Sequence, residues 1–192
     1  MEKSLSRARK GRVATILLAG AAVLGGSVWL SLNVWTAPVG LIWHSIHGRS
    51  IIFDGHTVDV PWDMWVENSS AQSLMIIREA PKYPLQQLPA GTIIIQRGSG
   101  RAADMSKDYD RIVRADETPP KGYRLQGTRR LFSEKGTAYC WELARTDASH
   151  ISISCWFDKD TLVAWYEGSP LYRDRFYRVL AAATGASEQP SS

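Results

Sequence analysis

Cysteine is scarce in this sequence, which has two, Cys140 and Cys155, among 192 residues. Their separation is far wider than the C-x-x-C spacing of thiol redox sites. A zinc site needs three or four ligands, which two cysteines alone cannot supply. No cysteine directly follows the apolar N-terminal run, so a lipid-modified cysteine anchor is excluded as well. The pair is therefore either a structural disulfide or two buried thiols.

Charged residues are absent from Val13 to Trp35, a run of 23 residues. A helix of that length crosses a hydrocarbon core of roughly 30 Å. The apolar region of a cleaved signal peptide is shorter, about 7–15 residues. We therefore expect an uncleaved transmembrane helix over residues 13–35, preceded by a basic tail over residues 1–12.

Basic residues lie before this apolar run, and none follows it until Arg49. The positive-inside rule then places the N-terminus in the cytoplasm and the C-terminal domain outside it. The expected location is the inner (cytoplasmic) membrane of a bacterium, crossed once. The basic tail suits the anionic cytoplasmic leaflet, so the membrane itself is an expected partner. The spacings Ala21-x₃-Gly25 and Ala22-x₃-Gly26 favour a weak homodimer through the anchor.

The part of the chain after residue 35 carries no net charge. Residues 1–35 contain five basic residues and one acidic residue, which leaves 18 of each kind in the remaining 157 residues. A nucleic-acid-binding domain carries a basic face. The composition therefore predicts that the protein binds no nucleic acid.

The elements expected after the anchor describe an α+β domain. Residues 36–48 read as a juxtamembrane connector, residues 49–185 as an extracytoplasmic domain and residues 186–192 as a flexible tail. Asp54-Gly55 between β-branched runs predicts a hairpin. Further strands are expected over 71–79, 92–97, 123–132, 137–145, 150–157 and 161–167, with helices over 104–114 and from Ser169-Pro170 to Gly185. The prediction is an antiparallel sheet of about six or seven strands, packed by a mid-chain helix and a C-terminal helix.

The order of these elements resembles the PsbP-like fold. The similarity rests on a first hairpin, a strand that ends in Val60-Pro61, and Trp65 shortly after it. A mid-chain helix, a meander and a closing helix follow, over residues 49–184. Envelope proteins of this type also carry an anchor, and the resemblance implies a non-enzymatic accessory or assembly factor.

The two cysteines fall on neighbouring strands of the expected meander. If the hairpin turns on Asp147 and Ala148, Cys140 stands directly opposite Cys155, within the distance range of a disulfide. Tyr139 then pairs with Trp156 on the other face. Disulfides persist in the oxidising compartment that the charge asymmetry indicates. We therefore predict a disulfide, with two buried free thiols as the alternative.

Residue patterns for catalysis and metal binding are weak. His44 and His47 share a helix face, but no acidic or cysteine partner stands at motif spacing, so we expect no metal site. Glu142, beside Cys140 and opposite Ile153, is either buried or an exposed edge residue. A single carboxylate is weak support for acid–base chemistry. The sequence thus predicts no catalytic residue and no cofactor.

Tryptophans are dense for a domain of this size. Core packing explains such rings, because each buries a large area. An exposed subset would instead line a groove for peptide, glycan or lipid. The candidate binding surface comprises Trp62, Trp65, Trp141, Trp156 and Trp165.

The function expected from these observations is binding or scaffolding. The protein is expected to be a membrane-anchored, extracytoplasmic factor of the cell envelope that engages an envelope protein. The alternative is an envelope hydrolase with an unrecognised active site, which requires a nucleophile, a base and an orienting group in one cleft.

Overall fold

The computed structural model describes residues 20–27, 36–78, 90–98, 101–113 and 119–188. The chain divides into two compact units, one of residues 1–35 with 81–88 and one of residues 36–80 with 89–192. The described part of the first unit is a helix over residues 20–27. All elements named below belong to the second unit.

The expected transmembrane helix is corrected by the structure. Among the described residues, no helix has both the length and the apolar character needed to cross a membrane. Within the span expected over 13–35, the described helix covers residues 20–27. The rest of that span, and the tail over 1–12, lie outside the described residues.

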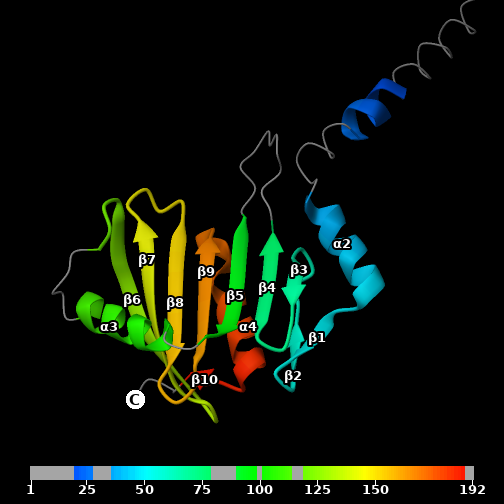
Figure 1. Ribbon diagram of the computed structural model, residues 1–192. Coiled ribbons are helices and arrows are strands. Elements are labelled where there is room, and N and C mark those ends of the chain that lie inside the picture. Colours follow the sequence, from blue (N-terminus) through cyan, green and yellow to red (C-terminus); the bar gives the residue numbers. More distant parts are fainter. Residues whose placement is uncertain (1–19, 28–35, 79–89, 99–100, 114–118, 189–192) are drawn as a thin grey trace, which may run out of the picture. The chain divides into compact units, whose positions relative to one another are not determined.

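An antiparallel sheet of eight strands, in the order β10-β6-β7-β8-β9-β5-β4-β3, forms the centre of the second unit (Figure 1). The strands are β3 (Trp65–Ser69), β4 (Ser73–Arg78), β5 (Gly91–Arg97), β6 (Tyr123–Ser133), β7 (Gly136–Arg145), β8 (Ile151–Phe157), β9 (Leu162–Gly168) and β10 (Ser187–Glu188). The α+β class and the meander from β6 to β9 are confirmed. The strand number differs because β3 and β10 were not anticipated and because the first hairpin forms a sheet of its own.

That first hairpin consists of β1 (Ser50–Phe53) and β2 (His56–Asp59), joined at Asp54-Gly55 as the sequence predicts. It packs with the C-terminal helix α4 (Arg173–Thr184) on one face of the sheet. The helix α3 (Arg101–Val113) covers the opposite face, over β7, β8 and β9 (Figure 1). The helix α2 (Thr36–His47) occupies most of the expected connector and contacts β3.

Strict alternation along the central strands separates the two faces. In β8, Ile151, Ile153, Cys155 and Phe157 are buried toward α4. The intervening residues face α3, where Trp156 packs into a smaller aromatic cluster. Successive side chains of a strand point to opposite faces of the sheet, so a strand that buries residues on both faces needs a covering layer on each side. The two helices and the hairpin supply those layers.

The C-terminal helix begins and ends close to the predicted residues. Ser169 caps a short 3₁₀ turn, η1 (Pro170–Tyr172), by accepting a hydrogen bond from the Leu171 N–H at 3.3 Å. Gly185 ends α4 with a left-handed φ of 64°, a conformation that costs glycine little. The positions of these two ends determine which residues of α4 face the sheet.

Candidate functional site

The two cysteines form a disulfide, as the hairpin register predicts. Cys140 on β7 and Cys155 on β8 are direct cross-strand partners with Cα atoms 4.1 Å apart, and both are fully buried toward α4. On the other face, Tyr139 stacks on Trp156 with ring centroids 5.0 Å apart. The pair therefore belongs to the architecture of the core.

The five candidate tryptophans do not share one surface. Trp141, Trp156 and Trp165 pack together beneath α3. Trp65 is buried on β3 opposite Ile77. Trp62 is 59% exposed and is the one exposed tryptophan of the described residues. The structure therefore gathers three of these rings in a core and leaves Trp62 as the candidate contact residue.

Glu142 is completely buried at the centre of one polar cluster, and so the exposed-edge alternative for it is wrong. The Tyr177 hydroxyl donates to Glu142 Oε1 at 2.6 Å. Arg129 of β6 and Arg173 of α4 form ion pairs with the two carboxylate oxygens, at 3.4 and 2.9 Å. Burial, followed by the hydrogen bond to Glu142, raises the pKa of Tyr177 well above its ordinary value.

Asp63 occupies a second buried cluster of the same composition. Arg78 of β4 and Arg175 of α4 both form ion pairs with its carboxylate. The Tyr172 hydroxyl lies 3.4 Å from Asp63 Oδ2. The Arg78 and Arg175 guanidiniums lie 5.4 and 4.4 Å from the centre of the Tyr172 ring. Burial, together with the charge of Asp63, raises the pKa of Tyr172.

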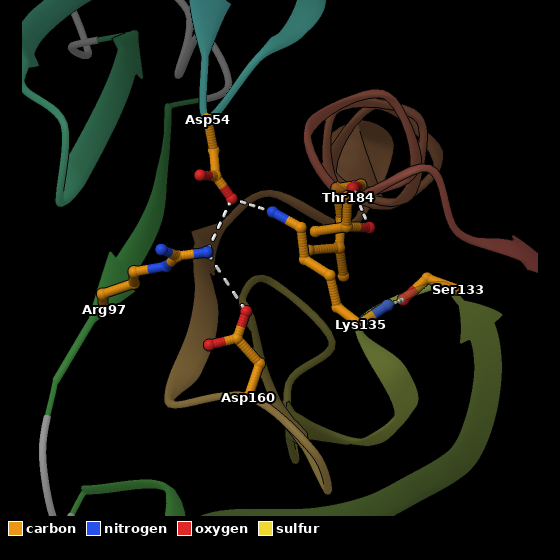
Figure 2. Close-up of polar contacts among 7 residues, drawn as sticks. Asp54, Arg97, Ser133, Lys135, Asp160 and Thr184 are labelled. Carbon is orange, nitrogen blue, oxygen red and sulfur yellow. Dashed lines mark hydrogen bonds and ion pairs between the residues drawn. The ribbon is translucent and has the colours of Figure 1, made fainter.

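A third set of charges fastens the tip of the first hairpin to one end of the large sheet. Figure 2 shows Asp54 accepting from Arg97 of β5, at 2.8 Å, and from Lys135 in the β6–β7 turn. Arg97 also reaches Asp160, in the β8–β9 turn, at 3.2 Å. Two cations and two carboxylates balance here. The arrangement holds the hairpin in place and leaves no charge for a ligand.

The histidines expected to share a helix face are bound to backbone carbonyls. His44 Nε2 lies 3.0 Å from the Pro61 carbonyl oxygen and His44 Nδ1 lies 2.9 Å from that of Gly48. His47 Nδ1 lies 3.1 Å from the Trp43 carbonyl oxygen. Within the described ranges, no three His, Cys, Asp or Glu side chains gather to hold a metal ion. His44 therefore has a structural role, in fixing the turn that carries Trp62.

A groove of about 410 Å³ lies beside that turn, between the end of β2 and α4. We call it the Trp62 groove. It is lined by Asp59, Val60, Pro61, Trp62, Arg175, Arg178, Val179 and Ala182. Its apolar residues include the buried Val60 and Val179, and its charged residues are two arginines and one aspartate. A concave apolar site with a few convergent polar groups is a typical ligand site.

Sequence reasoning identified Trp62 but missed the partners that make its site. Asp63 and Arg175 are 112 positions apart, and no local pattern joins them. One signal was available in α4, where Arg175, Arg178, Val179 and Ala182 follow the i, i+3, i+4, i+7 spacing of a single helix face. That face overlaps the buried stripe of the helix at Val179.

Comparison with known proteins returned no match: neither a protein-family model nor a curated protein is similar to this sequence. The functional argument therefore rests on the Trp62 groove and the clusters around it.

Proposed function

We propose that the domain of residues 36–188 is a non-enzymatic binding or scaffolding module that engages a partner through the Trp62 groove. The observation that carries the proposal is the exposure of Trp62 at a groove that also presents arginine. Tryptophan and arginine are the residues most enriched among interface hot spots. The exposed indole lies beside the buried Val60 and Val179 of the groove, so it offers a partner an apolar surface rimmed by charged side chains.

The backbone beneath Trp62 is held in place, which supports the proposal. The Met64 N–H donates to the Pro61 carbonyl at 2.9 Å and closes the turn. The His44 ring is bound to the same carbonyl oxygen. Gly40 of α2 lies so close that a Cβ there would stand 3.1 Å from the Trp62 carbonyl oxygen. A preorganised anchor loses little conformational freedom on binding, and that preserves affinity.

The buried carboxylates also favour binding over hydrolysis. Glu142 and Asp63 each contact two guanidiniums and one tyrosine hydroxyl. Both carboxylates are buried and neither lines the Trp62 groove, whereas a general base must reach the proton it removes. This arrangement of the carboxylates supports a domain that binds a partner at its surface over one that hydrolyses a substrate.

The compartment forms part of the proposal. A buried cross-strand disulfide, Cys140–Cys155, persists where thiols are oxidised and is rare in a reducing cytosol. We place the domain on the extracytoplasmic side of a cell envelope, with an envelope protein as its partner.

The test is site-specific photo-crosslinking in cells that make the full chain. A crosslinking residue at position 182, which lines the groove, is expected to capture a discrete protein, and one at position 107 on α3 is not. Trp62→Ala should reduce the captured product at least about fivefold, because a central tryptophan contributes 2 kcal/mol or more. The matched control is Leu171→Ala, since Leu171 is 76% exposed and does not line the groove.

Two results would remove the proposal. One is equal capture from positions 182 and 107. The other is a product at position 182 that Trp62→Ala leaves unchanged.

A further inference from the structure

We infer that the Trp62 groove binds an acidic protein segment, in which an Asp or Glu carboxylate lies next to an apolar side chain. This inference rests on the binding function proposed above and specifies its ligand. The carboxylate binds Arg178 and Arg175, and the apolar side chain packs on Trp62.

The helical face that lines the groove alternates charge with apolar surface. Arg175 and Arg178 are one turn apart on α4, and Val179 and Ala182 continue the same face. A ligand lying along this face meets two guanidiniums and two small apolar side chains. Its own polar and apolar groups must therefore be neighbours.

Arg178 is available to a ligand. It is exposed, and it forms no hydrogen bond or ion pair with any described residue, including Asp174 four positions earlier. Guanidinium presents its N–H groups in a planar fork that matches a carboxylate. A groove residue with this capacity and no partner among the described residues points to a ligand that supplies the acceptor.

Arg175 is held in position by the cluster beneath the groove. Its guanidinium pairs with Asp63 and lies 4.4 Å from the centre of the Tyr172 ring, and its side chain remains 24% exposed. Because Asp63 is already shared with Arg78, the pairing leaves positive charge in excess. The buried cluster thus orients a second cation at the groove without neutralising it.

The charge balance selects a singly charged anion. Three guanidiniums, those of Arg78, Arg175 and Arg178, face the two carboxylates of Asp63 and Asp59. One carboxylate on the ligand closes this balance. A phosphate group, with a charge of about −1.5 to −2, would bring repulsion from Asp59 at the rim. Asp59 is instead suited to accept a peptide N–H.

The apolar part of the groove matches a side chain in size and character. Trp62 offers a flat indole, and Val60 and Val179 lie buried beside it. The volume of about 410 Å³ lies within the usual range of ligand sites, about 300–1,000 Å³. Recognition of acidic motifs by arginines is an established mode of peptide binding. These features together favour a peptide over a lipid chain, which would find charged side chains along the helical face of the groove.

The test is an NMR titration of the full ¹⁵N-labelled chain, observed at the Trp62 indole N–H and the Arg178 Nε–H. The probes are acetyl-glutamyl-phenylalanine amide and its glutaminyl counterpart, which differ in one charge. We expect both signals to shift with the glutamyl probe, and its Kd to be at least about fivefold lower than that of the glutaminyl probe. In Arg178→Gln that ratio should fall below about twofold.

Arg124→Gln is the matched control, because Arg124 is exposed on β6, forms no ion pair with the described residues and does not line the groove. This variant should keep the full preference for the glutamyl probe. A carboxylate can also come from the C-terminus of a peptide. Acetyl-phenylalanine, which has a free C-terminal carboxylate, tests this second source. It should bind more weakly than the glutamyl probe.

Three results would overturn the inference. The two dipeptides could bind with equal Kd, or the NMR shifts could occur at residues other than Trp62 and Arg178. The third is a lower Kd for acetyl-phenylalanine than for the glutamyl probe. The first two results leave the crosslinking test of the binding function intact. If crosslinking from position 182 still depends on Trp62 while the dipeptides fail, only the ligand class is wrong. If both fail, the groove is not a binding site.

Discussion

The Asp63 and Glu142 clusters have the same composition and differ in how open they are. Each buried carboxylate meets one arginine from a strand, one arginine from α4 and one tyrosine from η1 or α4. At Glu142 the two arginines are 30% and 33% exposed. At Asp63 they are 11% and 24% exposed, and the more exposed one lines the Trp62 groove. Similar charge sets can therefore have different surroundings: both arginines at Glu142 reach solvent away from the Trp62 groove, whereas at Asp63 one arginine is largely buried and the other lines that groove.

The largest effect is expected when each carboxylate is replaced by its amide. Asp63→Asn leaves the largely buried Arg78 without its anion and should cost about 3–5 kcal/mol of unfolding free energy. Glu142→Gln should cost less, about 1–3 kcal/mol, because Arg129 and Arg173 can turn toward water. Urea unfolding of both variants measures the difference. A larger loss for Glu142→Gln would mean that arginine exposure does not govern these clusters.

The disulfide should be coupled energetically to the Glu142 cluster and not to the Asp63 cluster. Cys140 lies two residues from Glu142 on the same face of β7. Replacing both cysteines with alanine should cost about 3 kcal/mol in the chain-entropy model. We expect this loss to be non-additive with Glu142→Gln and additive with Asp63→Asn. A double-mutant cycle in urea distinguishes the two. Additivity with both would place the disulfide outside the Glu142 cluster.

The tyrosines of the two clusters should make the stability of the domain depend on pH in the alkaline range. The pKa values of Tyr172 and Tyr177 are raised in the folded state, so the stability they contribute is full below about pH 10, the ordinary tyrosine value, and is lost as pH rises above it. Tyr177→Phe should cost about 1.5–3 kcal/mol at pH 7, because it removes a hydrogen bond to a buried carboxylate. It should also weaken the decline of stability above pH 10, measured by unfolding at pH 8 to 12. An unchanged slope would show that folding does not raise the pKa of Tyr177.

The smallest effect should come from the two groove arginines compared with each other. Arg178→Gln removes no hydrogen bond or ion pair with a described residue, and its unfolding free energy should stay within about 0.5 kcal/mol of the natural chain. Arg175→Gln removes an ion pair to buried Asp63 and should cost clearly more, about 1–3 kcal/mol. Thermal unfolding at pH 7 measures both. Equal losses would mean that Arg178 has a structural role.

Local patterns predicted much of the domain. The Cys140–Cys155 register followed from a turn at Asp147 and Ala148, because a period of two fixes every partner once the turn is placed. The C-terminal helix and the 3₁₀ turn that leads into it followed from the cap at Ser169 and the end at Gly185. Both depend on residues that are near in the chain.

Other elements were missed for reasons that lie outside local sequence. β3 carries an irregular register between Val66 and Asn68 and exposes Glu67, Asn68 and Ser69, so it lacks clean alternation. The strand β10 has two residues and exists through pairing with β6. The apolar run near the N-terminus gave a transmembrane prediction that no described helix supports.

The candidate site was the least predictable part. Trp62 appeared in the sequence as one of five equivalent tryptophans, and burial separated it from the others. Asp63 gains its partners from β4, η1 and α4, which the chain brings together only when the sheet and α4 are assembled. Tertiary contacts of this kind are not encoded in residue spacing.

The β1–β2 hairpin has a mechanical consequence. It forms a two-stranded sheet of its own and is held to the rest of the domain by side chains, among them Phe53, Val58 and the charges around Asp54 (Figure 2). Once the contact between α2 and β3 has parted, a pulling force applied through α2 reaches this hairpin along the chain before it reaches the eight-stranded sheet. The hairpin can separate without breaking a backbone ladder of the large sheet, while β7 and β8 stay joined by their disulfide. The domain would therefore yield under tension in two steps, and the first step would open the wall of the Trp62 groove.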